Sequence, residues 1–290
     1  MSTSTVQTLQ GKQSGQPQDR RSVLVTGADG RIGSSFARRA SQRYRLRLMV
    51  QAGSDSREEI QAYGEVIAAD LVDLERLKEV CRGIDTVVHL AADPQPSATW
   101  SSILPNNIVG TYHMFAAAKA AGCRRVVFAS SIHAVSGYPT DRQVRSDDPV
   151  NPGDLYGVSK CFGEALGRYM AEQENLSVVA IRIGSFGPPE HAASPQSIPI
   201  LDSFVSDRDL TQLIQRCIEV EDLRFAIFNG VSDNDFKRLD ISDARARVGY
   251  QPEDNAARLN MTLHAAEVNL SPAAHNLTQP DEQSGLRQDL

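Results

Sequence analysis

The chain has 290 residues, and its 36 acidic and 30 basic side chains give a formal net charge of −6 at pH 7. A chain of this length can bury a hydrophobic core without disulfides. Its charges are interspersed, which excludes a basic stripe for nucleic acid, and no apolar run approaches the roughly 18 residues of a membrane-spanning helix. The four cysteines include no C-x-x-C pair, so neither a zinc site nor a secreted disulfide framework is indicated. We expect a cytoplasmic protein without metal, membrane or nucleic-acid partners.

The two ends of the chain differ in composition from its middle. Residues 1–20 are rich in Ser, Thr, Gln and Gly and lack the apolar core of a secretory signal. Residues 266–290 are polar again, with too few large apolar side chains to order themselves. We predict disordered tails at 1–20 and 266–290 and a folded unit at 21–265.

The folded unit opens with a pattern typical of dinucleotide binding. Residues 22–26 form a short β-branched run, as in a strand buried on both faces of a parallel sheet. Gly27, Gly30 and Gly33 come next, and then the helical pattern of residues 32–40. This spacing lets the backbone turn tightly and approach a pyrophosphate, which meets the N-terminal amides of the helix. A plain strand-to-helix turn is the alternative.

The cofactor preference depends on the residues after the second predicted strand, which spans 45–50. An NAD-selective site usually places an Asp or Glu there for the ribose hydroxyls, but this chain has Val50, Gln51 and Ala52. Gln51 could bond a hydroxyl or be an ordinary loop residue. The cofactor is therefore NAD or NADP, with NAD favoured. We expect weak discrimination between NAD and NADP, because no carboxylate at the end of this strand repels the 2′-phosphate of NADP.

Apolar runs and helical patterns alternate along the next part of the chain. Strands are predicted at residues 66–70, 86–92 and 124–129, with a helix at 74–81. This alternation implies an α/β Rossmann-type fold, a doubly wound parallel sheet with its ligand across the carboxyl ends of the strands. Asp70 then lies near the adenine or caps the next helix. Ala91 and Ala92 let the backbone pass close to the cofactor.

Tyr156 and Lys160 lie four residues apart in a helical pattern, so their side chains project from one face. A nearby ammonium favours the phenolate, which can take a proton from an alcohol. An ordinary surface pair is the alternative. Ser131 ends a strand where the ligand is expected and either donates to a substrate oxygen or caps a helix. Asn107 interrupts a helical stretch and either joins a proton relay or faces solvent.

The glycine motif, the strand ending in Ser130 and Ser131, and Tyr156-x-x-x-Lys160 together resemble the extended short-chain dehydrogenase/reductase family. The resemblance covers residues 21–250. It implies a Rossmann core with a small carboxyl-terminal substrate lobe, formed mainly by residues 185–265.

Within that family, several motifs are similar to those of uronate dehydrogenases, which oxidise C1 of a hexuronic acid to a lactone with NAD. Three positions depart from this pattern. Ile132 replaces an asparagine, Asp93 stands where those enzymes have a serine, and residues 190–201 lack the arginine that holds the substrate carboxylate. Either Arg208 or Arg182 replaces that arginine, or the substrate is not a uronate. We interpret Arg182 as structural.

The resemblance implies an NAD(P)-dependent oxidoreductase that acts on a sugar or sugar acid. A nucleotide-sugar epimerase or dehydratase is the enzymatic alternative, and a cofactor-binding regulator without turnover is the other. Tyr156 is then the base, Lys160 lowers its pKa and holds the nicotinamide ribose, Ser131 orients the reacting hydroxyl, and Asn107 completes the relay. The implied substrate contacts are Ser131, His133, Ser185 and Arg208. The implied cofactor contacts are Gly27, Asp29, Gly30, Arg31, Ile32, Gly33, Gln51, Asp70, Leu71, Leu90, Ala91, Ala92, Asn107, Tyr156, Lys160 and Ile183. A homo-oligomer is compatible with the sequence.

Overall fold

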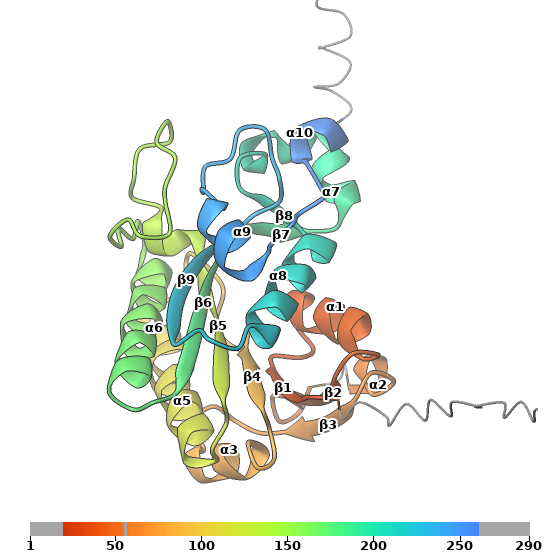
Figure 1. Cartoon of the computed structure of the whole chain (residues 1–290), viewed down its shortest axis with the longest axis vertical. Coiled ribbons are helices and arrows are strands. Elements are labelled where there is room, and N and C mark those ends of the chain that lie inside the picture. The colour runs from red at the N-terminus through yellow and green to blue at the C-terminus, as the bar shows by residue number, and fades with distance from the viewer. Residues whose placement is uncertain (1–19, 55–56, 261–290) are drawn as a thin grey trace, which may run out of the picture.

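The computed structural model describes residues 20–54 and 57–260, so the predicted tails lie outside the described residues except for Arg20. Its centre is a seven-stranded parallel sheet in the order β3-β2-β1-β4-β5-β6-β9 (Figure 1). The strands are β1 (Ser22–Thr26), β2 (Arg45–Val50), β3 (Glu65–Ala68), β4 (Thr86–His89), β5 (Arg125–Ser131), β6 (Ser177–Ile183) and β9 (Phe225–Gly230). The strand order reverses between β1 and β4, where ligands bind in doubly wound sheets.

Helices cover both faces of this sheet (Figure 1). Helices α3 (Leu74–Val80), α5 (Gly110–Ala120) and α6 (Leu155–Glu172) lie on one face, and α1 (Arg31–Ala40) and α8 (Asp207–Glu219) lie on the other. Val23 and Val25 pack in the buried cluster that includes residues of α1 and α8, whereas Leu24 packs with residues of α3 and α5. Both faces are buried, which explains the unbroken apolar runs of the strands. The predicted doubly wound fold is confirmed.

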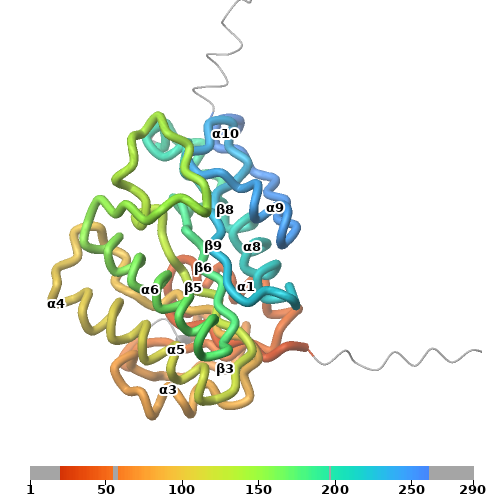
Figure 2. The backbone as a smooth tube through the Cα atoms, turned by 60° about the vertical axis from the view of Figure 1, so that its left-hand side comes forward, coloured from red at the N-terminus to blue at the C-terminus, as the bar shows by residue number. Residues whose placement is uncertain are grey.

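Shorter helices fill the connections, and one irregular run lies beside α6 (Figure 2). Helix α4 (Trp100–Ile103), a π-helix at Leu104–Val109 and α5 come one after another without a break. The π-helix contains Asn107, so the interruption expected in this helical stretch is a local change of helix type. Further short helices in these connections are α2 (Arg57–Ile60), α9 (Ser242–Val248) and a 3-10 helix at Ile132–Val135. No helix in the described ranges is long and apolar enough to cross a membrane.

Two strands end at residues other than those predicted from the sequence. Strand β4 stops at His89, and Leu90 to Ala92 leave the sheet. Strand β5 continues instead to Ser131, because its last two residues pair with Arg182 and Ile183 of β6. Strand β5 therefore extends further than its neighbour β4 at the carboxyl edge of the sheet.

A small second layer of structure lies beyond this edge (Figure 1). Strands β7 (Ser185–Gly187) and β8 (Phe204–Ser206) pair in parallel, and the lobe also holds α7 (Pro189–Ala193), a 3-10 helix at Pro195–Ile200 and α10 (Ala256–Leu259). Ala192, Phe204 and Ala256 form its own buried cluster. Helix α8 and strand β9 lie within the predicted lobe range of residues 185–265 but pack in the main layers.

A buried ion pair fixes α6 to the sheet. Arg182 on β6 donates from Nε and Nη2 to the two carboxylate oxygens of Glu164 on α6, at 2.9 and 3.0 Å. The Ser130 hydroxyl of β5 donates to the same carboxylate at 2.6 Å. The two charged side chains are only 1% and 3% exposed. Arg182 is thus structural, as predicted.

This pair yields a stability prediction. Glu164→Gln leaves the buried guanidinium without a counter-charge and should lower the free energy of unfolding by about 3 to 5 kcal/mol. The double change Glu164→Leu with Arg182→Met removes both charges and should cost much less. Urea unfolding measures both. Glu172→Gln, which breaks an exposed pair with Arg168 on the same helix, is the matched control and should cost less than about 1 kcal/mol. Equal losses in the single and double variants would contradict this account.

Candidate active site

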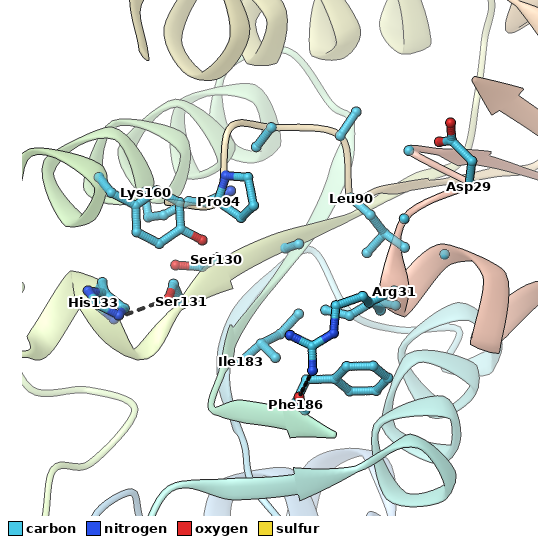
Figure 3. Close-up of a pocket in the computed structure, with 18 of the residues that line it drawn as sticks. Asp29, Arg31, Leu90, Pro94, Ser130, Ser131, His133, Lys160, Ile183 and Phe186 are labelled. Atoms are coloured by element: carbon cyan, nitrogen blue, oxygen red, sulfur yellow. Dashed lines mark hydrogen bonds between the residues drawn. The ribbon is translucent and has the colours of Figure 1, made fainter. Parts of the chain in front are cut away.

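A cavity of about 790 Å³ lies at the carboxyl edge of the sheet, between the main layers and the small lobe (Figure 3). It is lined by most of the residues predicted to bind cofactor or substrate. These are Gly27, Asp29, Gly30, Arg31, Ile32, Gly33, Gln51, Asp70, Leu71, Leu90, Ala91, Ala92, Ser131, His133, Tyr156, Lys160, Ile183 and Ser185. Residues from both halves of the chain therefore share one space.

The glycine loop fits a dinucleotide pyrophosphate. Gly27 has φ of +62°, and a Cβ there would lie 3.0 Å from the Ala91 backbone. A Cβ on Gly33 would lie 2.2 Å from the Gly27 carbonyl oxygen, so loop and helix can pack this closely only with glycine. Helix α1 begins at Arg31 with neither a side-chain cap nor an acidic residue in its first turn. Its first amides are left to bind phosphate oxygens.

Thr26 and His89 fix the backbone of Leu90 and Ala91, which line the cavity beside the glycine loop. The backbone amides of Leu90 and Ala91 both donate to the Thr26 hydroxyl oxygen at 3.1 Å. The hydroxyl proton is then free to go to His89 Nδ1, 2.8 Å away. Burial, with the nearby Lys160 charge, lowers the pKa of His89 to about 3, so the imidazole is neutral. Two buried side chains thus hold Leu90 and Ala91, which line the cavity, in place.

Asp154 sets the start of α6. Its Oδ1 accepts a hydrogen bond of 2.7 Å from the Gly157 amide and caps α6, and its Oδ2 lies 2.6 Å from His133 Nδ1. The His133 and Tyr156 rings pack in a T-shaped arrangement, with 5.4 Å between centroids. Ser131 caps the 3-10 helix after β5, because its hydroxyl oxygen accepts from the His133 amide at 3.2 Å. Its own proton remains available for another oxygen.

Tyr156 and Lys160 are buried side by side, with the ammonium 5.4 Å from the phenol ring centroid. Burial lowers the pKa of Lys160 to about 8. Burial also raises the pKa of Tyr156, and its hydrogen bond with Ser131 only partly opposes that rise. The direction is opposite to the one expected from the Tyr-Lys spacing, because desolvation and the nearby Asp154 and Asp93 carboxylates disfavour the phenolate more than the Ser131 hydrogen bond favours it.

Two predicted site residues do not line the cavity. Asn107 is buried in the π-helix, where its side chain accepts from the Asp93 amide at 2.8 Å and donates to the Asp93 carbonyl and the Ser159 hydroxyl at 3.0 Å. Ser159 in turn donates to the Tyr156 carbonyl. Arg208 on α8 pairs with Glu253 and Asp254, so its charge is used at the protein surface.

Sequence reasoning also missed part of the lining. The additional residues are Met49, Val50, Ala69, Pro94, Ala129, Ser130, Ile132, Gly184, Phe186, His191 and Ile200. Most adjoin predicted residues at strand ends, where a wider window would have included them. Phe186, His191 and Ile200 come from the small lobe, and no local motif in the sequence marks them.

Comparisons with known proteins agree with this geometry. The model of the NAD dependent epimerase/dehydratase family matches residues 23–219. A protein of Haloferax volcanii named NAD-dependent glucose-6-phosphate dehydrogenase is 40% identical over 253 residues, which cover 81% of this chain and 94% of that protein. Uronate dehydrogenase of Pseudomonas putida is 32% identical, covering 87% and 90%.

A solved structure is also similar. The crystal structure of uronate dehydrogenase from Agrobacterium tumefaciens matches with a TM-score of 0.74 and 30% identity, covering 89% of this chain and 93% of that one. The family predicted from the glycine motif and the Tyr-Lys pair is confirmed. The chain belongs to the NAD-dependent epimerase/dehydratase family.

Proposed function

We propose that this protein oxidises C1 of an aldose to the lactone, with NAD as hydride acceptor. One observation carries the proposal: a cavity that holds a phosphate-binding glycine loop at one end holds Ser131, Tyr156 and Lys160 at the other. A dinucleotide whose pyrophosphate lies at the α1 N-terminus reaches toward the carboxyl ends of β4 and β5. Ser131 is the last residue of β5, and Tyr156 and Lys160 follow on α6.

The chain's own residues handle the proton of the reacting hydroxyl. Ser131 donates a hydrogen bond to the C1 oxygen, and Tyr156 takes the hydroxyl proton as the C1 hydrogen leaves with its electron pair. The bound nicotinamide supplies the acceptor for that hydride. Lys160 holds the nicotinamide ribose, and its ammonium favours the Tyr156 phenolate once the ribose oxygens compensate its burial. Asn107 acts indirectly, because its hydrogen bonds to Asp93 and Ser159 fix the Asp93 backbone and the first turn of α6.

The first candidate substrate is a hexose 6-phosphate, which is an aldose without a carboxylate. The relative with 40% identity is named for glucose 6-phosphate. Among the described residues that line the cavity, Arg31 is the one arginine, and it donates to the Phe186 carbonyl. The stretch 190–201 contributes His191 in place of an arginine, and an imidazole cannot bind a carboxylate with the two parallel bonds of a guanidinium. A hexuronate is the second candidate, because of the matched uronate dehydrogenases.

A cytoplasmic location is also proposed. The four cysteines are free thiols, and Cys81, Cys123 and Cys217 are buried. Free buried thiols fit a reducing compartment. A homo-oligomer stays a prediction.

A substrate panel tests the function. Glucose, glucose 6-phosphate, glucuronate, galacturonate and UDP-glucose are each assayed with NAD and with NADP for reduced nicotinamide. We expect kcat/KM for glucose 6-phosphate with NAD to exceed the uronate values by about tenfold or more. A uronate as the best substrate would favour the second candidate. Interconversion of UDP-glucose without net reduction of NAD would contradict both.

The role of Tyr156 is tested by removing its hydroxyl. Tyr156→Phe should lower kcat by about 100 to 10,000-fold, because it deletes the proton acceptor. The dissociation constant for NAD should change little, since the ring stays in place. Tyr112→Phe, on the exposed side of α5, is the control and should keep full activity. Activity of Tyr156→Phe within threefold of wild type would rule out Tyr156 as the base.

The lowered pKa of Lys160 predicts that the free energy of unfolding depends on pH. Its pKa is about 8 in the folded protein and 10.5 when exposed, so below pH 8 a buried charge opposes folding. Between pH 8 and 10.5 the unfolded chain binds more protons, and this group makes wild-type stability rise with pH. Lys160→Met should therefore raise the free energy of unfolding by about 1 to 3 kcal/mol at pH 7, and the gain should shrink toward pH 10.

Urea unfolding at both pH values measures this difference. Lys78→Met, at a partly exposed position on α3, is the control and should show no such pH dependence. If Lys160→Met destabilises the protein equally at both pH values, Lys160 is not held as a desolvated ammonium.

A further inference from the structure

A carboxylate lies at the end of β2 although the sequence after that strand supplies none. Asp29 comes from the glycine loop, and its Oδ2 accepts a hydrogen bond of 2.6 Å from the Ser54 hydroxyl. The Ala28 amide donates to the Met49 carbonyl at 3.1 Å, which ties the loop to the end of β2. Asp29 and Gln51 both line the cavity. Two segments 25 residues apart thus meet where a strand-end acid usually lies.

This position corresponds to the adenosine ribose of a bound dinucleotide. In doubly wound folds the pyrophosphate lies at the N-terminus of the first helix, and the ribose 2′-hydroxyl lies near the carboxyl end of the second strand. Asp29 directly precedes Gly30, the N-cap of α1, and reaches β2 through Ser54. Among the described residues no donor bonds its other oxygen, Oδ1. That oxygen can accept from a ribose hydroxyl.

The charges around Asp29 disfavour a phosphate. Arg31 is two residues away, but its guanidinium points to another part of the cavity and donates to the Phe186 carbonyl at 2.8 Å (Figure 3). The neighbouring lining residues whose side chains the structure describes are Val50 and Gln51, which are neutral, and Asp70, which is acidic. A 2′-phosphate would approach carboxylates here, with no described cation beside it.

We propose that Asp29 is the residue that selects NAD against NADP. It accepts a hydrogen bond from the ribose and repels a 2′-phosphate, and Ser54 holds it in place. The weak discrimination expected from the missing strand-end acid is thereby replaced by a clear preference for NAD. The inference rests on the proposed function only in that the cavity takes a dinucleotide.

Direct binding of NAD and NADP to the full chain tests the inference without any sugar. We expect wild type to bind NAD at least about 100-fold more tightly than NADP. Asp29→Asn keeps the shape of the side chain and removes the charge, so it should reduce this ratio about tenfold or more, mainly through tighter NADP binding. Ser54→Ala should reduce the ratio less, because the carboxylate remains but is no longer held.

Glu75→Gln changes the net charge by the same amount on the exposed side of α3 and should leave the ratio within about twofold. Circular dichroism confirms that the variants fold. The inference is overturned if wild type binds both cofactors equally, or if Asp29→Asn and Ser54→Ala both bind NAD and keep the wild-type ratio. Selective NAD binding that depends on Asp29, with no oxidation of any sugar, would support this inference and contradict the proposed function, so the two failures are distinguishable.

Discussion

The burial of the Lys160 ammonium is the physical constraint on which the rest of this site depends. Lys160 is 4% exposed, and a charge there is stable only where the surrounding structure prevents the side chain from turning to solvent. Helix α6 provides that constraint, because the Asp154 cap fixes its first turn and the Glu164–Arg182 pair fixes its third. The same two contacts determine where Tyr156 points, since it lies between them on the same helix.

The buried polar groups around α6 fix the positions of the Tyr156 and Lys160 side chains but lower the free energy of unfolding. A desolvated lysine ammonium opposes folding, whereas the sheet on which it rests is apolar on both faces and can offset that cost. The arrangement leaves Tyr156 protonated in the free protein. It also means that small changes in nearby charge have large effects on the proton, because the local dielectric constant is low. The free site is thus set up to respond to the cofactor.

Much of the site was accessible from the sequence because it obeys short-range rules. Strand ends, the glycine spacing and the four-residue step from Tyr156 to Lys160 each fix geometry within a few residues. Predictions failed where the outcome depends on partners far along the chain. Arg208 has the charge that a substrate anion needs, but its guanidinium donates to Glu253 and Asp254 at the surface. The Asn107 amide is taken up by Asp93 and Ser159, which no local pattern indicates. The direction of the Tyr156 pKa shift depends on burial, which only the packed structure provides.

In the proposed reaction, the hydride comes from C1 of an aldose. The most direct measurement supplies the protein with NAD and glucose 6-phosphate that carries deuterium at C1, and then determines the isotopic composition of the reduced nicotinamide by mass spectrometry. This account predicts one deuterium in each reduced nicotinamide and a lactone without deuterium at C1. Reduced nicotinamide without deuterium, or labelled sugar returned as an isomer with no net reduction, would contradict it.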